Sequence, residues 1–106
     1  MKSEKAIQNE IMMVLSKNGC KVFRSNAGTV KTEDGRVIKL MPKGFPDLCG
    51  FRTSDGKMLF IEVKNEKGRL RDDQVKFGEF LKQHPVIYGV CRSAEEALNL
   101  VLEEIE

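Results

Sequence analysis

The sequence lacks any apolar run long enough to cross a membrane. A bilayer span requires roughly 20 consecutive apolar residues, and no stretch of the 106-residue chain approaches that length. Residues 1–5 are polar and lead into a helical pattern, unlike the apolar stretch of a secretory signal peptide. We therefore expect a cytoplasmic protein with no membrane contact.

Cysteine and histidine are scarce, which argues against a zinc site or a disulfide framework. The three cysteines, Cys20, Cys49 and Cys91, are odd in number and far apart, whereas zinc sites use close pairs and disulfide scaffolds use an even, denser set. We interpret them as reduced core residues. The only histidine, His84, lies beside Pro85 at the expected end of a helix, where we expect it to cap the helix and to serve neither as a ligand nor as a general base.

Length and charge indicate one domain with an anionic partner. A chain of 106 residues with 41% hydrophobic and 32% charged residues can bury one core but not a second, so we assign residues 1–106 to a single domain. The formal net charge is +2, yet residues 94–106 contain five glutamates and no lysine or arginine. The rest of the chain therefore carries a charge of +7. This asymmetry suits an anionic partner on one side of the molecule.

The spacing of apolar residues predicts helices alternating with strands. Helical spacing covers residues 3–18 and 72–83, and a capping box at 93–96 opens a third helix. An Asp-Gly turn predicts a protruding ribbon within residues 26–44. The remaining β-prone segments are residues 20–25, 47–52, 57–64 and 86–91. The expected fold is therefore of the α/β class.

Two polar residues lie on apolar stripes of the expected helices. Glu10 follows Ile7 by three residues, so we expect its carboxylate to point toward the body of the protein, where it needs a partner or a metal. Gln74 precedes Phe77 at the same spacing. Each has a simpler interpretation, with Glu10 turning sideways to solvent and Gln74 capping a loop. Glu4, by contrast, has an ordinary solvent position.

The central hairpin brings two carboxylates and a lysine to one face. If two residues form its turn, Asp47 lies opposite Lys64, and Cys49 lies opposite Glu62. Directly opposed residues share a face of the sheet, so Asp47, Glu62 and Lys64 are expected to converge at the open end of the hairpin. A loop one residue longer or shorter would turn Asp47 away.

This convergence is typical of a metal site for phosphate chemistry. Adjacent carboxylates repel unless a cation lies between them, and oxygen ligands favour Mg²⁺ or Mn²⁺. Such an ion lowers the pKa of a bound water and neutralises charge on a phosphate. Lys64 can orient that water, and Glu10 and Gln74 can support the metal, the lysine or the water. Taken singly, Glu62 and Lys64 can also be a solvated pair, and Asp47 a turn residue.

The order of these residues resembles that of a nuclease superfamily. Pro46-Asp47 followed by Glu62-Val63-Lys64 resembles the PD-(D/E)XK signature. The chain is further similar to the VRR-NUC family, in the compact stand-alone form found in phages and bacteria. The residues that carry this second resemblance are Glu10, Arg24, Asn26, the segment Gly44-Phe45-Pro46-Asp47-Leu48, Glu62-Val63-Lys64 and Gln74.

The resemblance implies a fold, a reaction and a set of site residues. The fold is a restriction-endonuclease-like mixed sheet flanked by helices, in the order α-β-β-β-α-β-α. The reaction is metal-dependent hydrolysis of phosphodiester bonds in DNA. The metal, Mg²⁺ or Mn²⁺, is held by Asp47, Glu62 and the backbone carbonyl of Val63, with Glu10 as an indirect ligand, and Lys64 acts on the attacking water. The implied catalytic residues are Glu10, Asp47, Glu62, Lys64 and Gln74.

The resemblance also implies branched DNA as the substrate. Stand-alone members are similar to Holliday-junction resolvases, so we expect a homodimer that acts on four-way junctions, with flaps as the alternative substrate, in the cytosol of a bacterium or phage host. The residues expected to bind DNA are Arg24, Asn26, Lys43, Lys67, Arg69 and Arg71. A solvated loop is the simplest interpretation of the last three. Arg71 also stands where the resemblance leads us to expect a small polar helix cap, which leaves the contacts of this loop open.

A rival hypothesis is a non-catalytic module that keeps the nuclease fold and binds structured DNA or serves in assembly. It predicts binding without metal-dependent cutting. The retained set of Asp47, Glu62 and Lys64 argues against it, because an abandoned site has no physical reason to keep two mutually repelling carboxylates.

Overall fold

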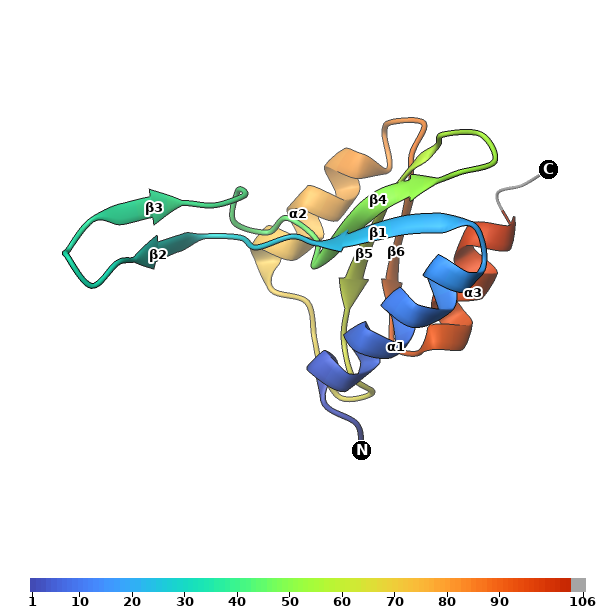
Figure 1. Ribbon diagram of the computed structural model, residues 1–106, viewed down its shortest axis with the longest axis horizontal. Coiled ribbons are helices and arrows are strands. Elements are labelled where there is room, and N and C mark those ends of the chain that lie inside the picture. Colours follow the sequence, from blue (N-terminus) through green and yellow to red (C-terminus); the bar gives the residue numbers. More distant parts are fainter. Residues whose placement is uncertain (104–106) are drawn as a thin grey trace.

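The computed structural model describes residues 1–103 as three helices and six strands (Figure 1). The boundaries predicted from the sequence agree with these elements to within two residues. In chain order the elements are α1 (Glu4–Lys17), β1 (Cys20–Arg24), β2 (Thr29–Lys31), β3 (Val37–Lys39), β4 (Leu48–Arg52), β5 (Met58–Val63), α2 (Asp72–Leu81), β6 (Ile87–Cys91) and α3 (Ala94–Glu103).

Four of the strands form one mixed sheet with the order β1-β4-β5-β6. The pairs β1/β4 and β4/β5 are antiparallel, whereas β6 runs parallel to β5. A parallel pair needs a long crossover, and α2 lies within that connection. The mixed sheet flanked by helices that the sequence predicted is therefore confirmed.

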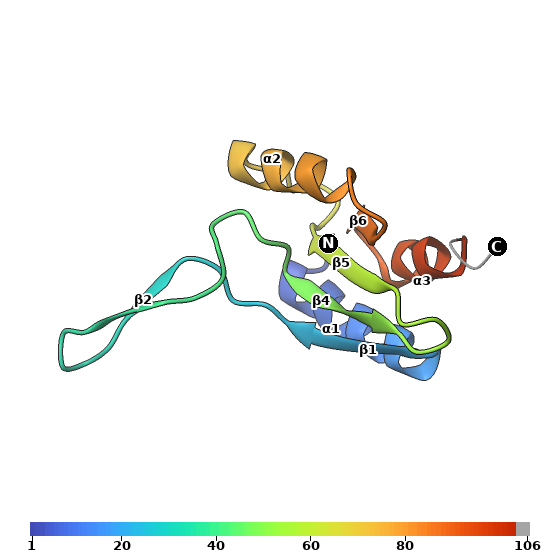
Figure 2. The same cartoon turned by 90° about the horizontal axis from the view of Figure 1, so that it is seen from above.

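The helices divide between the two faces of the sheet. Helices α1 and α3 pack against one face, where they share a core with Leu48, Ile61 and Val63, and α2 lies over the opposite face (Figure 2). Because strand side chains alternate, β5 directs Ile61 and Val63 toward the α1 and α3 layer and Glu62 toward α2. Glu62 thus lies on the face of the sheet that α2 covers, opposite the face covered by α1 and α3.

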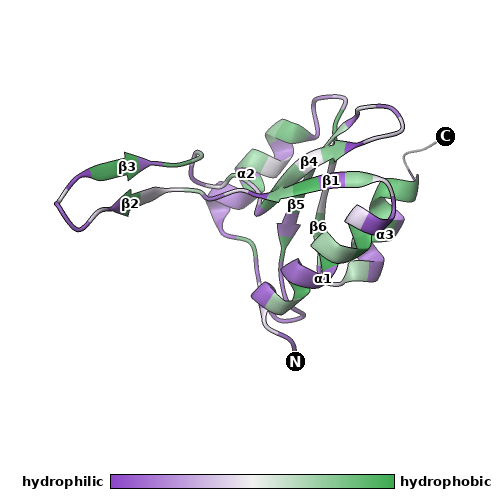
Figure 3. Ribbon diagram, in the orientation of Figure 1, coloured by the Kyte–Doolittle hydropathy of each residue, from purple (hydrophilic) through white to green (hydrophobic). Residues whose placement is uncertain are grey.

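Strands β2 and β3 project from the body as a separate two-stranded ribbon (Figure 1). Val30 pairs with Ile38, and all six ribbon strand residues are exposed. Much of β3 is coloured as hydrophobic in Figure 3 even though no core covers it. An isolated two-stranded hairpin is only marginally stable in water. The protruding ribbon predicted from the sequence is confirmed, and backbone pairing within the ribbon holds it together.

The register of the β4/β5 hairpin differs from the predicted one by two residues. Leu48 pairs with Ile61 and Cys49 with Phe60, so the next pair along the register places Asp47 opposite Glu62. The predicted pairings of Asp47 with Lys64 and of Cys49 with Glu62 are therefore wrong. The reason is the turn, since Arg52 N donates to Lys57 O at 3.0 Å and four residues, not two, connect the strands. A shift of two residues preserves the alternation, so Asp47 and Glu62 still share a face.

The helix ends carry the caps that the sequence predicted. Ser3 Oγ accepts a hydrogen bond from Ala6 N at 3.1 Å at the start of α1, and Ser93 Oγ accepts from Glu96 N at 3.1 Å at the start of α3. After α2, His84 Nδ1 lies 3.0 Å from Phe80 O. None of the helices within residues 1–103 combines the length and the apolar content needed to cross a membrane.

Candidate active site

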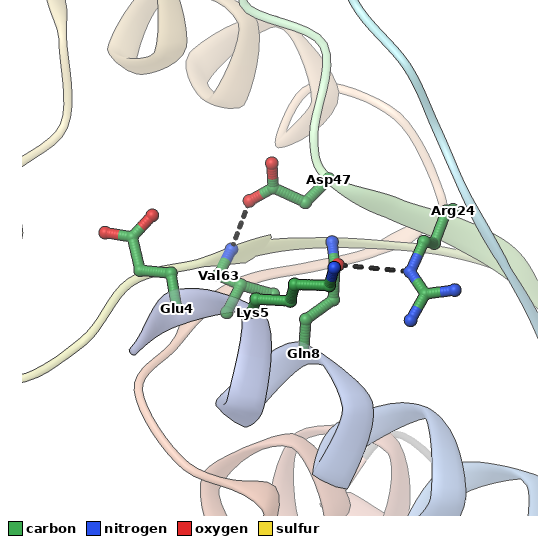
Figure 4. Close-up of a pocket in the computed structure, with 6 residues that line it drawn as sticks. All are labelled: Glu4, Lys5, Gln8, Arg24, Asp47 and Val63. Atoms are coloured by element: carbon green, nitrogen blue, oxygen red, sulfur yellow. Dashed lines mark hydrogen bonds between the residues drawn. The ribbon is translucent and has the colours of Figure 1, made fainter. Parts of the chain in front are cut away.

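Asp47 lies at the start of β4 and is fixed by the end of β5. Its Oδ2 accepts a hydrogen bond from Val63 N at 2.8 Å (Figure 4). Pro46 before it is buried, and Asp47 O accepts from Ser25 N at 2.8 Å. These contacts hold Asp47 just before β4, at the end of the sheet where β4 begins between β1 and β5.

Glu62 is buried beside Asp47 and is neutral at pH 7. Its side chain is 1% exposed, and Gln74 Nε2 donates to Glu62 Oε1 at 3.1 Å. Burial raises the pKa of Glu62 to about 9, and the hydrogen bond with Asp47 and the charge of Asp47 act in the same direction. The positive charges of Lys64 and Arg71 oppose this shift. A pKa raised in this way indicates that the site disfavours a second negative charge beside Asp47.

Gln74 connects the N-terminus of α2 to this pair. While its amide nitrogen bonds Glu62, its Oε1 accepts from Arg71 N at 2.9 Å. Arg71 is the N-cap residue of α2, and its side chain makes no cap hydrogen bond, because a guanidinium has no acceptor. Gln74 satisfies this backbone N–H, as one half of a capping box. The capping contact of Gln74 therefore exists, and the same side chain also contacts Glu62.

Lys64 follows β5 directly and is 7% exposed. Its backbone N donates to Cys91 O at 3.1 Å. Its side chain passes close to Gly68, because a Cβ added at Gly68 would lie 3.2 Å from Lys64 Cδ and 2.8 Å from Glu4 Oε2. Lys64 and Glu4 therefore both approach Gly68, in the loop that follows β5.

A cleft of about 500 Å³ opens beside Asp47, and α1 forms one of its walls. Figure 4 shows Asp47 above the first turns of α1, with Glu4 on one side and Arg24 on the other. The helix residues in the cleft are Glu4, Lys5 and Gln8. Glu4, which we expected to be an ordinary solvent residue, thus lies at the site, and the sequence analysis missed both Glu4 and Gln8.

The expectation that Glu10 points toward the site is wrong. Its side chain is 43% exposed and pairs with Lys2 Nζ at 2.8 Å, and it lines a different and smaller pocket, of about 160 Å³. The physical reason is helix phase, since residues four apart share a face and residues two apart do not. Glu4 and Gln8 share the face toward Asp47, so Glu10 cannot. The i, i+4 spacing of Glu4 and Gln8 was the signal in the sequence that could have identified them.

The residues expected to bind DNA do not line one common cleft. Arg24 lies in the cleft beside Asp47, where its Nε donates to Gln8 Oε1 at 3.2 Å and its guanidinium also bonds Asn9. Lys43 and Arg71 line a second cleft at the base of the ribbon. The exposed residues Asn26, Lys67 and Arg69 lie before the ribbon and in the loop before α2.

Arg92 is a further residue that the sequence analysis missed. Its Nη1 donates to Asn65 O at 2.5 Å and to Gly68 O at 2.7 Å. Its backbone N donates to Glu96 Oε1 at 2.7 Å. Arg92 therefore ties the loop after Lys64 to the start of α3. No motif in the sequence marks it, because both of its side-chain acceptors are backbone carbonyls.

The donor set suits a hard cation that keeps part of its shell as water. Within residues 1–103, no three histidine, cysteine or acidic side chains gather at one point. Mg²⁺ is commonly bound through one or two carboxylates together with water and substrate phosphates. Asp47 and Glu62 are such a pair, and the negative charge of Asp47 contributes to the raised pKa of Glu62. The residues present therefore fit Mg²⁺ or Mn²⁺ better than a metal that needs a full set of protein ligands.

Comparison with known proteins agrees with this fold. The VRR-NUC domain profile matches residues 2–95. A solved structure described as a VRR_NUC domain superposes with a TM-score of 0.66 at 19% sequence identity, over 95% of this chain and 97% of the other. No curated protein matches the chain. The chain therefore belongs to the VRR-NUC family, a family of nucleases, and the resemblance inferred from the sequence is confirmed.

Proposed function

We propose that this protein is a metal-dependent, structure-selective endonuclease that hydrolyses phosphodiester bonds in branched DNA. The observation that carries the proposal is the Asp47–Glu62 pair. Glu62 is buried with its pKa raised to about 9 beside a second carboxyl group. A protein gains no stability from such a pair by itself, whereas a divalent cation between the two groups makes the arrangement favourable.

The bound metal, Mg²⁺ or Mn²⁺, would supply an activated water and neutralise charge on the phosphate. Asp47, Glu62 and the backbone carbonyl of Val63 are the proposed ligands. The Val63 N–H orients Asp47 through its hydrogen bond to Oδ2, and Gln74 orients Glu62 through its bond to Oε1. Both carboxyl groups are thus held in place before any ion binds.

Lys64 is the proposed contact of the attacking water or the phosphate. In support, its side chain is almost fully buried and its positive charge acts on Glu62, and a fixed cation beside the proposed metal ligands would stabilise negative charge that develops during hydrolysis. Glu4 replaces Glu10 in our proposal as the acidic residue of α1, because Glu4 lines the cleft that contains Asp47. We do not retain the indirect metal role for Glu10.

Four-way junctions cut by a homodimer are the proposed substrate and assembly. One small domain carries one carboxylate pair, and symmetric cutting of a junction needs two sites on two strands, which a twofold dimer supplies. The exposed apolar residues of the ribbon, among them Val30, Val37 and Ile38, offer a surface for the second copy. Flaps, which a monomer can cut, are the alternative. We further propose action in the cytoplasm of a bacterium or phage host.

DNA binding is proposed for the cations along the site edge. Arg24 borders the cleft beside Asp47, and Lys43 and Arg71 border the cleft on the ribbon side. Lys67 and Arg69 extend from the loop that follows Lys64, and Asn26 lies before the ribbon. Contacts to phosphates position a duplex without reading its sequence, as a structure-selective enzyme requires.

The deciding experiment is cleavage of labelled four-way junction, flap and linear duplex DNA with Mg²⁺, Mn²⁺ or EDTA. Lys64→Met keeps the buried stem and removes the charge, so we expect cleavage to be lost and DNA binding to persist. Lys82→Met, an exposed change at the end of α2, is the matched control. Wild-type cleavage rates for Lys64→Met would overturn the assignment of Lys64.

The same experiment separates the alternatives. Paired cuts across the junction, together with a dimer in light scattering, would support the resolvase. Cutting of the flap alone, by a monomer, would keep the chemistry and remove the dimer. Binding without cutting under every metal would favour the non-catalytic module.

A further inference from the structure

A second cleft, of about 600 Å³, lies between the base of the ribbon and the start of α2. Lys39 enters it from the end of β3, Lys43 from the loop before β4, and Arg71 from the start of α2. No carboxylate is among its lining residues, and the rest of the lining is largely apolar, with Met41 and Pro42 between the two lysines. Two segments of the chain, residues 39–43 and the start of α2, thus direct positive charge into one cleft.

The walls of this cleft are held in place by backbone contacts. Gly28 N donates to Met41 O at 2.9 Å, and Leu40 N donates to Gly28 O at 2.9 Å. These bonds hold together the two segments that form the base of the ribbon. On the other wall, Gly44 packs against the backbone of Asp73 in α2 so closely that a Cβ would collide with it. The cleft is therefore a preformed feature of the fold.

The net charge of the cleft is positive even after its one neighbouring acid is counted. Arg71 Nε pairs with Asp73 Oδ1 at 3.2 Å, and Lys43 also acts on Asp73, so that the pKa of Asp73 is lowered. Among the described residues, the lining of the cleft contains no acidic side chain that would offset Lys39 and Lys43. The cations of the lining can bind phosphates, and its apolar residues can contact deoxyribose. This combination suits a DNA backbone, in which phosphates alternate with deoxyribose.

The position of the cleft relates it to the carboxylate pair. Asp47 follows the loop that carries Lys43, and it also lines the first cleft beside α1. Arg71 lies close enough to Glu62 for its charge to act on that carboxyl group. Asp47 and Glu62 therefore lie between one cleft with Lys5 and Arg24 and another with Lys39, Lys43 and Arg71.

We propose that the ribbon-base cleft binds the DNA backbone on one side of the scissile phosphate, with Lys39 as a phosphate contact. This inference rests on the proposed nuclease function and adds the path of the strand, from the α1 cleft across the carboxylate pair to the base of the ribbon. It assigns the base of the ribbon to DNA and leaves only its outer part for a second copy.

The test compares Lys39→Ala with Lys31→Ala. Lys39 pairs with Thr29, which lies two residues before Lys31 on β2, so both lysines lie on the same face of the ribbon. Of the two, only Lys39 lines the cleft. Junction binding is measured by fluorescence anisotropy in EDTA at several salt concentrations. We expect Lys39→Ala to weaken binding by about three- to tenfold and to reduce the salt slope by about one. Lys31→Ala should leave both nearly unchanged.

The outcomes distinguish this inference from the proposed function. If the wild type cuts junctions and Lys39→Ala binds like the wild type, the cleft assignment is overturned and the nuclease remains. Equal losses in both variants would also overturn it, because the whole ribbon and not the cleft would then contact DNA. A changed mass in light scattering with unchanged DNA affinity would assign the cleft to a second copy. A wild type that binds no DNA would remove the proposed function itself.

Discussion

The side-chain amide of Gln74 donates to Glu62 Oε1 at 3.1 Å and is the link between α2 and the end of β5. Its oxygen accepts at the same time from the backbone N–H of Arg71, the N-cap residue of the helix. The start of α2 and the orientation of the buried carboxyl group therefore depend on one residue. A change at this position should affect helix stability and site chemistry together.

Gln74→Ala should destabilise the protein by about 1–3 kcal/mol, because it removes two hydrogen bonds and leaves a buried carboxyl group without its donor. Urea unfolding monitored by circular dichroism measures the loss. Lys76→Ala, at an exposed position of the same helix, is the control and should change the stability little. Combining Gln74→Ala with Glu62→Gln gives a double-mutant cycle, and additive losses would show that the two side chains do not interact.

Glu62 should make the metal-free protein less stable as the pH rises. The folded pKa is about 9, against 4.5 for the free group, so the folded state keeps a proton that the unfolded chain releases between these values. The contribution of this bound proton to the free energy of unfolding is fully present below pH 4.5 and is lost as the pH rises through 9. The slope reaches at most about 1.4 kcal/mol per pH unit.

Glu62→Gln should remove this pH dependence, because Gln is neutral at every pH and keeps the shape of the protonated acid. Unfolding curves in EDTA between pH 5.5 and 8.5, for wild type and variant, measure the difference. The variant should gain stability relative to the wild type as the pH increases. Parallel curves would show that Glu62 ionises as freely in the folded protein as in the unfolded chain.

The sequence was sufficient for the elements and the face that carries the site. Period-two and helical patterns are local, so strand and helix boundaries followed from them. The antiparallel pairing of the hairpin, together with the alternation of side chains along each strand, placed Asp47 and Glu62 on one face. The register of the hairpin was not available in the same way, because it depends on whether Arg52 pairs with Lys57 or the turn tightens by two residues.

The part of α1 that faces the site could not be read from apolar spacing alone. The stripe through Ile7 and Ile11 shows which side is buried in the core, but the site lies beside the core, on a flank of the helix. Glu10 adjoins that stripe on one flank, while Glu4 and Gln8 lie on the other. Only the position of the helix relative to β4 and β5 decides between the two flanks.

Gly68→Ala should impair cleavage with little loss of stability. The added methyl group would lie 2.8 Å from Glu4 Oε2 and 3.2 Å from Lys64 Cδ, and the ends of two flexible side chains can move aside at low cost. We expect a fall in the cleavage rate of about tenfold, which corresponds to roughly 1.4 kcal/mol, and a melting temperature close to the wild-type value. In a Glu4→Ala background the methyl group should cost less, and an equally large effect there would exclude Glu4 as the cause.

Arg92→Lys should loosen the loop after β5 while keeping the charge. One ammonium group cannot reproduce the guanidinium contacts to Asn65 O and Gly68 O. Hydrogen exchange of the loop amides should accelerate, and the cleavage rate should fall while junction affinity is unchanged. Arg36→Lys at the tip of the ribbon is the control, since the Arg36 side chain pairs with Asp34 two residues away. Unaltered exchange in the loop would show that Arg92 does not hold it.

The ribbon and the four-stranded sheet share no side-chain core, so they need not open together. Strands β2 and β3 contribute no residue to the buried cluster, and their pairing can break locally without exposing Leu59 or Ile61 to water. Amide protection should therefore fall into two classes, with fast exchange in the ribbon and slow exchange in β4 and β5. A molecule with a frayed ribbon would still keep the hydrogen bond from Val63 N to Asp47. Binding of an extended substrate at the ribbon and hydrolysis at the carboxylate pair are therefore separable properties of one small chain.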